Sequence, residues 1–287
     1  MSTNLHSKAS LLALAAIAVA IVVGPVAQAG TVAPGFAGNT LAANDDGSTS
    51  LIALPFTTNY FGNNYTGLYV NNNGNVTFNS PLGTYTPFGL GGGYSGQPII
   101  APFFGDVDTR GAGSGLTSWG TATYAGHTAF GVTWPGVGYF ANQVDKLNTF
   151  QLIMVDRTDT GAGNFDFYFN YDQIQWETGS ASGGQGGLGG TSAAVGYNAG
   201  QTGNPPGTYA QLPGSLVNGA LLDNGPDSLV RNTNDNTPGQ FLFQVRNGQV
   251  VTTPVPEPSS LAMFIIGLLG LVGLGTLRRR HGSEHRN

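Results

Sequence analysis

Apolar and polar side chains alternate with a period of two along much of the chain between residues 51 and 246. In residues 165–171, four aromatic side chains are separated by Asp166, Tyr168 and Asn170. Successive side chains of a β-strand point to opposite faces, so this segment predicts a strand with one face in the core. Residues 150–155 are apolar on both faces, which is typical of a strand in the middle of a sheet.

Turn signals separate the alternating segments. Asn73-Gly74 joins two such segments, and this dipeptide favours the positive φ angles of a tight hairpin. The apolar run 98–104 contains Pro98 and Pro102, and it predicts a buried strand at a sheet edge or a strand start. No amphipathic helix with capping signals interrupts the pattern. We therefore predict an all-β domain, a mainly antiparallel sandwich with long Gly-rich loops.

The composition agrees with a turn-rich β protein. Glycine supplies 46 of 287 residues, and charged residues make up only 9%. The net charge of −5 excludes a generally basic nucleic-acid-binding protein. Cysteine is absent, which excludes disulfide frameworks, thiolate metal sites and cysteine nucleophiles.

The N-terminal residues 1–29 have the pattern of a secretory signal peptide. Residues 11–23 are all Ala, Leu, Ile or Val, and Ala27 and Ala29 form a small-x-small cleavage site. Thirteen residues span about 20 Å as a helix, less than a bilayer core of about 30 Å. A signal peptide is therefore favoured over a membrane anchor.

A second address lies at the C-terminus. Pro256, Glu257 and Pro258 precede an uncharged run at 261–277, and an arginine cluster follows. Residues 258–277 are twenty uncharged residues that span about 30 Å as a helix, which is enough to cross a membrane, and the arginines predict a cytoplasmic tail. In this order, the elements resemble the PEP-CTERM sorting signal, although a plain anchor helix is the alternative. The resemblance implies processing by an exosortase in an exopolysaccharide-producing bacterium, through Pro256, Glu257, Pro258, Arg278, Arg279 and Arg280.

The central part of the chain resembles the NIDO (nidogen-like) domain. Seven sequence blocks carry the likeness in the same order: 69–74, 100–111, 132–134, 148–152, 169–174, 176–179 and 194–200. Animal relatives are matrix and adhesion proteins, so the resemblance implies an extracellular structural role. The family has no agreed catalytic or ligand residues, and none is transferred to this chain.

These features predict the domain organisation. The expected parts are a signal peptide at 1–29, an N-terminal leader of the mature chain at 30–50, the NIDO-like β domain at 51–246, a linker with the Pro-Glu-Pro motif at 247–260, an apolar helix at 261–277 and a basic cytoplasmic tail at 278–287.

Two carboxylates are the main candidates for chemistry. Asp106 and Asp108 are two residues apart, with Arg110 next in phase, so all three share one face of a strand. Such a pair could serve a glycosidase or hold Ca²⁺. We favour structural Asp–Arg pairing without a stoichiometric metal, because Arg110 competes for the same carboxylates.

Other motifs give weaker signals. Residues 184–189 match G-x-G-x-x-G, but no βαβ unit surrounds them, so a loop is favoured over a dinucleotide site. His127 follows Gly126 in a predicted turn and is favoured as an exposed turn residue. The run Asn71-Asn72-Asn73 is interpreted as turn chemistry. Core packing is favoured over sugar stacking for most of the aromatics, among them Tyr60, Tyr65, Tyr85, Tyr94, Tyr139 and Trp176.

The combined prediction is a secreted or cell-surface, non-enzymatic protein of the cell-matrix adhesion type. Its expected partners are the exosortase and an extracellular or exopolysaccharide matrix, with membrane contact through residues 261–277 before processing. No cofactor and no nucleic acid are expected. The alternative is a carbohydrate-active protein, either a glycan-binding module or a glycosidase.

Overall fold

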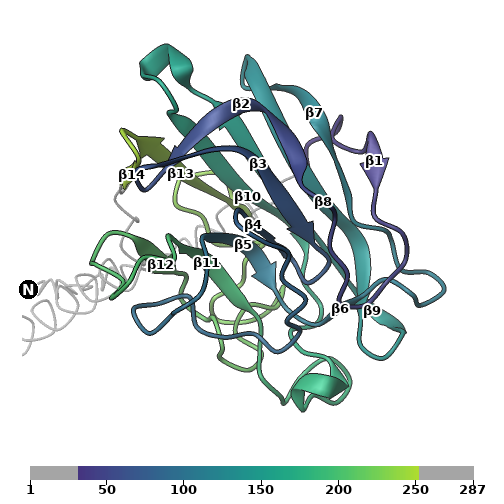
Figure 1. Ribbon diagram of the computed structural model, residues 1–287. Helices are drawn as coiled ribbons and strands as arrows, with labels where there is room; N and C mark the ends of the chain where they lie inside the picture. The colour runs from purple at the N-terminus through teal and green to yellow at the C-terminus, as the bar shows by residue number, and fades with distance from the viewer. Residues whose placement is uncertain (1–31, 252–287) are drawn as a thin grey trace, which may run out of the picture.

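The computed structural model describes residues 32–251, and two antiparallel sheets face each other across a common core (Figure 1). The eight-stranded sheet runs in the order β1 (Asn39–Thr40), β7 (Ser118–Tyr124), β8 (His127–Tyr139), β9 (Gln143–Asp156), β10 (Phe165–Gln173), β13 (Gln240–Arg246), β14 (Gln249–Val251), with β6 (Val107–Asp108) paired to β8. The six-stranded sheet runs in the order β12 (Tyr209–Gln211), β11 (Ala194–Asn198), β5 (Ile99–Phe104), β4 (Asn75–Thr77), β3 (Asn63–Asn71), β2 (Ile52–Tyr60). The predicted all-β, antiparallel architecture is confirmed.

Aromatic side chains from both sheets meet in the core. Phe103 of β5 lies 5.2 Å from Phe150 of β9, and Phe150 in turn stacks on Trp134 of β8 at 4.9 Å, measured between ring centroids. The face of β10 that carries Phe165, Phe167, Phe169 and Tyr171 is fully buried, as the period of two in the sequence predicted. Burial of this apolar surface is the main stabilising term of such a sandwich.

The position of β5 differs from one part of the sequence prediction. β5 lies between β4 and β11 in the interior of its sheet, not at an edge. Pro98 precedes the strand, which fits the predicted strand start. Pro102 lies where the register with β11 shifts between Ala101 and Phe104. The irregular pairing there tolerates the missing N–H group of proline.

The described part of the predicted leader, residues 32–50, is integrated into the fold. β1 pairs with β7 at the edge of the larger sheet, and the side chain of Phe36 is 2% exposed. Phe36 fills the space above Gly131, where a Cβ atom would overlap its ring. A single phenylalanine in a Gly/Ala-rich segment carries no periodicity, so the sequence pattern does not indicate this packing.

Within residues 32–251, the helical elements are two 3₁₀ turns, Thr158–Thr160 and Ser180–Ser182. No helix in this range is long and apolar enough to cross a membrane. The predicted signal peptide, Pro-Glu-Pro motif, apolar helix and basic tail lie outside the described residues.

The hairpin turn between β3 and β4 is buried and joins several parts of the fold. Asn71, Asn72 and Asn73 are each at most 1% exposed. The Asn72 side chain donates to the carbonyls of Asp45 and Val107, and the Asn72 carbonyl accepts from the indole N–H of Trp134. The prediction that these asparagines form a turn is confirmed, and their side chains also form a buried hydrogen-bond network.

Gly74 completes this turn at φ +75°, where a Cβ atom would overlap the carbonyl oxygen of Phe103. We expect Gly74→Ala to destabilise the fold by more than about 2 kcal/mol, because steric overlap adds to the strain of positive φ. Urea denaturation measures the loss. The matched control is Gly126→Ala in the β7–β8 turn, at φ +84° with open space around it, where about 1 kcal/mol is expected. Equal losses in the two variants would contradict a steric role for Gly74.

Candidate functional site

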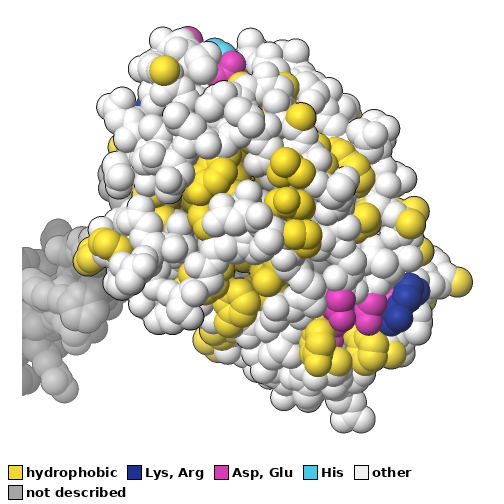
Figure 2. All heavy atoms as spheres, viewed as in Figure 1, with side chains coloured by type: hydrophobic (Ala, Val, Ile, Leu, Met, Phe, Trp, Pro, Cys, Tyr) yellow, Lys and Arg dark blue, Asp and Glu magenta, His cyan; other side chains and the backbone are white. Residues whose placement is uncertain are grey.

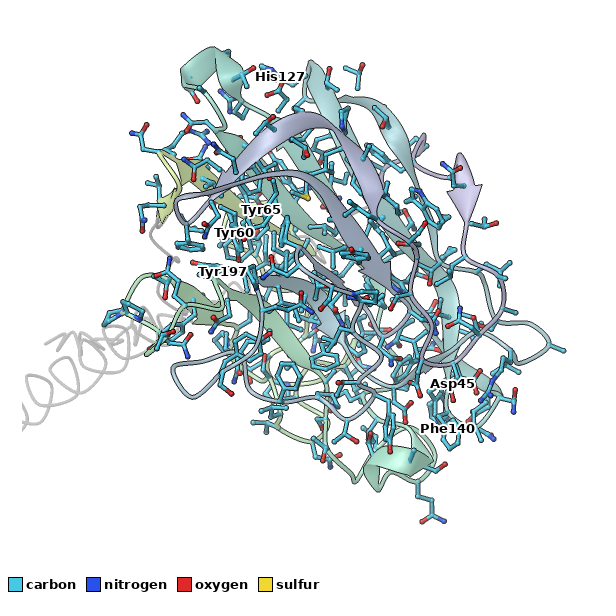
Figure 3. All side chains as sticks on the ribbon, viewed as in Figure 1. Asp45, Tyr60, Tyr65, His127, Phe140 and Tyr197 are labelled. Carbon is cyan, nitrogen blue, oxygen red and sulfur yellow. The ribbon has the colours of Figure 1, made fainter. Side chains whose placement is uncertain are left out.

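Three aspartates meet near the buried turn. Asp45 and Asp46 lie in the loop before β2, and Asp106 lies immediately before β6. One carboxylate oxygen from each lies within 4.8 Å of the others. Figure 2 shows acidic side chains beside a basic one on an otherwise sparsely charged face, in the corner where Figure 3 labels Asp45 and Phe140. Asp106 is the member of this cluster that the sequence spacing singled out. Asp45 and Asp46 come from a distant part of the chain and reach it through tertiary contacts.

The asparagine turn holds the loop that carries two of these carboxylates. The Asn72 side chain donates to the Asp45 carbonyl at 2.6 Å. The Asn73 side chain donates to Asp46 Oδ1 at 2.9 Å and accepts from the Val107 N–H at 3.0 Å. The turn therefore fixes the 45–46 loop and the start of β6 against each other.

Asp106 is buried, and it has no hydrogen-bond partner within residues 32–251. Its residue exposure is 1%, and neither carboxylate oxygen accepts a hydrogen bond from this part of the chain. Gly179 lies against it, and a Cβ atom at that position would overlap Asp106 Oδ2. A buried carboxylate in this condition is energetically costly, since desolvation is not compensated by donors.

Asp108 has the opposite environment. Its carboxylate accepts from Arg110 Nε at 2.9 Å, from Arg110 Nη2 at 2.7 Å and from the backbone N–H groups of Arg110 and Asn142. Arg110 Nη2 also lies 3.0 Å from Asp45 Oδ2. The predicted Asp–Arg pairing thus occurs at Asp108, with Asp45 as the second partner in place of Asp106.

The electrostatics follow from these contacts. Burial, and then the neighbouring charges of Asp45, Asp46 and Asp108, raise the pKa of Asp106 to about 7. Burial is also the largest cause that raises the pKa of Asp45 to about 6. Burial alone would raise the pKa of Asp108, but hydrogen bonds from Arg110 and Asn142 hold it below its ordinary value.

Two weaker candidates show no assembled site. His127 begins β8 at the far end of the molecule from Asp45 (Figure 3). Residues 184–189 form a turn closed by a bridge between Gln185 and Leu188, and no helix follows the glycines. The phosphate-binding geometry of a dinucleotide fold needs that helix.

Most of the candidate aromatics belong to the core. Tyr60, Tyr139 and Trp176 are at most 2% exposed, whereas Tyr85 is 40% exposed. One surface hollow has a volume of about 880 Å³, and no carboxylate lines it. Its side-chain walls come from Ser80, Leu82, Phe88, Tyr94, Ser95, Gln97 and Gln211.

Glu177 is a structurally important residue that the sequence analysis did not identify. Its fully buried carboxylate accepts from the N–H groups of Gly219 and Leu221, each at 2.6 Å, and from Ser192 Oγ at 3.0 Å. Burial raises its pKa, and these hydrogen bonds oppose that shift. Residue type alone gives no signal here, since the donors lie up to 44 positions away in the sequence.

The sequence profile of the Nidogen-like domain matches residues 66–123 and 116–247. The chain belongs to the nidogen-like domain family. The profile of the PEP-CTERM protein-sorting motif matches residues 254–280, so both resemblances found in the sequence are confirmed. No solved structure matches this nidogen-like chain.

Curated relatives support the family assignment. Alpha-tectorin of Gallus gallus is 32% identical over 245 residues, which cover 76% of this chain and 10% of the relative. Alpha-tectorin of Mus musculus is 33% identical over 231 residues, with coverages of 72% and 10%. Nidogen of Drosophila melanogaster is 28% identical over 236 residues, with coverages of 73% and 16%. The nidogen-like chain therefore spans about a tenth of the length of the alpha-tectorins.

Truncation of Asp108 tests its structural role. We expect Asp108→Ala to destabilise the domain by about 1–3 kcal/mol, because it leaves the Asn142 N–H without its acceptor and Arg110 without its bidentate partner. Chemical denaturation gives the value. Asp159→Ala is the control, since its ion pair with Arg157 is exposed to solvent and is expected to contribute little to stability. A loss at position 108 no larger than that at 159 would contradict the prediction.

The Glu177 contacts can be tested locally. Glu177→Gln replaces one acceptor oxygen by a donor group that faces backbone N–H groups. We expect a destabilisation of about 1–3 kcal/mol. In this variant, hydrogen exchange should also accelerate at the Gly219 and Leu221 amides, whereas the amides of β9 should exchange as in the wild type. Unchanged exchange at those two amides would show that the carboxylate does not hold this loop.

Proposed function

We propose that this protein is an exported, non-enzymatic structural component of a bacterial extracellular matrix or cell surface. The single observation that carries the proposal is a nidogen-like domain on the same chain as a PEP-CTERM sorting motif. Homologues with the domain are extracellular matrix proteins, and the motif indicates export with exosortase processing. The adhesive role within an exopolysaccharide matrix is the finer part of this proposal.

The site geometry supports the non-enzymatic assignment. A glycosidase needs two carboxylates that flank a sugar in a cleft. Asp108, one of the two predicted candidates, is fully engaged with Arg110 and Asn142. The surface hollow has no carboxylate in its lining. These arrangements favour a structural role over the carbohydrate-active alternative.

Fractionation of the native host tests the assignment to the outside of the cell. We expect the protein in the matrix or outer-surface fraction, with an intact mass that lacks the signal peptide and the segment after the Pro-Glu-Pro motif. Deletion of the gene should weaken the cohesion of the matrix without abolishing exopolysaccharide synthesis. A protein found intact in the cytoplasm, or a deletion without effect on cohesion, would contradict the proposal.

The sorting motif gives a separate prediction. Glu257→Ala, and independently replacement of Arg278, Arg279 and Arg280 by glutamine, should leave an untrimmed protein in the inner membrane. The physical reason is that the arginines fix the orientation of the apolar run in the membrane, and the Pro-Glu-Pro motif is then presented to the exosortase. Cell fractionation with intact-mass analysis gives the readout, and Glu284→Ala is the control outside the motif. Normal release of a trimmed protein from both variants would exclude exosortase processing.

A further inference from the structure

The unpartnered carboxylate of Asp106 points to a missing positive charge. Both of its oxygens and Asp45 Oδ1 are buried and accept no hydrogen bond within the described residues. Buried polar groups in native proteins are almost always paired with a donor, water or an ion. Repulsion among these neighbouring carboxylates adds to the cost of burial. A bound cation would supply the compensation that these oxygens lack within the described residues.

We propose that Asp45, Asp46 and Asp106 bind a calcium ion. One oxygen from each carboxylate lies within 4.8 Å of the others, so a single ion can contact all three. The side chain of Asp106 lies at the interior of the cluster, and its 1% exposure makes it the buried end of the site. Asp45 and Asp46 are not buried, so the outer side of the cluster is open to solvent.

Arg110 does not supply the missing charge to Asp106. Its Nε and Nη2 atoms form the bidentate pair with Asp108, and Nη2 also contacts Asp45 Oδ2. Among the residues that the structure describes, these contacts leave Asp45 Oδ1 and both oxygens of Asp106 without a donor. The sequence pattern predicts that Arg110 competes for the carboxylates of Asp106 and Asp108 and that no metal binds. In the structure the guanidinium contacts Asp108 and Asp45, so the Asp106 carboxylate is available to a cation.

The donor set selects calcium among the common divalent ions. All three side chains offer hard carboxylate oxygens, the chain has no cysteine, and His127 lies at the opposite end of the molecule. Zinc prefers nitrogen and sulfur ligands. Magnesium requires a near-ideal octahedron and keeps several waters, whereas calcium accepts six to eight oxygens in flexible geometry. Carboxylates on two separate loops fit the calcium pattern better.

Surrounding contacts pre-form the cluster. Asn73 binds Asp46 Oδ1 and the Val107 N–H, so it sets the position of one ligand relative to the segment that carries Asp106. Gly179 leaves space for the Asp106 carboxylate. A bound ion would connect the 45–46 loop to the start of β6, and calcium should therefore stabilise the folded protein by mass action.

Calcium titration of the purified full chain tests the proposal. After treatment with EDTA and removal of the chelator, calorimetry should show one calcium site per chain. Calcium at about a hundredfold excess over Kd should raise Tm by roughly 5–10 °C. Near-ultraviolet circular dichroism of the buried Trp134 and Trp176 follows unfolding. Magnesium at the same concentration should give less than half of that shift.

The variants locate the site. Asp106→Asn should fold without calcium, because it removes an unpaired buried charge, and should lose the calorimetric site and the rise in Tm. Asp45→Asn is the second variant, in the other loop, and should weaken calcium binding at least tenfold. Asp172→Asn is the control, an exposed acid outside the cluster that should leave the response unchanged.

Three results would overturn the proposal. One is a wild-type chain with no calorimetric site and no calcium-dependent rise in Tm. Another is a wild-type response that persists in both Asp106→Asn and Asp45→Asn, which would place the ion elsewhere. The third is an equal response to magnesium, which would exclude the calcium assignment. The test does not depend on the proposed matrix function, because it requires only the purified protein.

Discussion

The buried asparagine turn between β3 and β4 is the constraint on which much of the structure depends. Backbone groups in the interior of a sandwich need hydrogen-bond partners, and the side chains of Asn71, Asn72 and Asn73 supply them to Leu82, Val107 and neighbouring residues. Through these bonds the turn joins the N-terminal loop, β6 and the indole of Trp134. Gly74 packs against the backbone of Phe103 within its own sheet, and a Cβ atom there would also lie 3.3 Å from the Phe150 ring of the facing sheet. The acidic cluster is a consequence, since the turn holds both loops that carry it.

Charged residues are few in this protein, and three of its buried carboxylates differ in the hydrogen-bond donors that compensate their charge. Asp108 is held by a guanidinium and two backbone donors, and Glu177 by backbone and hydroxyl donors. Asp106 has none of these partners among the described residues. The carboxylates of Asp108 and Glu177 therefore hold neighbouring backbone segments in place, whereas that of Asp106 is a candidate ion ligand. The difference arises from donor geometry, because all three carboxylates are buried.

Sequence pattern predicted the strands well because alternation reports directly on which face is buried. The strand β10, the central position of β9 and the β3–β4 hairpin all follow from it. It did not predict that β5 is an interior strand, since the irregularity that accommodates Pro102 depends on its partner β11. The candidate site was only half predictable. Asp106 and Asp108 could be found from local spacing. That Arg110 pairs with Asp45 and not with Asp106 depends on a loop more than 60 residues away.

The arrangement of the larger sheet determines how this domain would carry a pulling force. β1 and β14, close to the two ends of the described chain, form its opposite edges. A load applied at the C-terminal side reaches β14 first, which has only three residues paired with β13. Short antiparallel pairs loaded from one end separate one hydrogen bond at a time. The edge strand β14 would therefore separate from β13 before the aromatic core between the sheets opens.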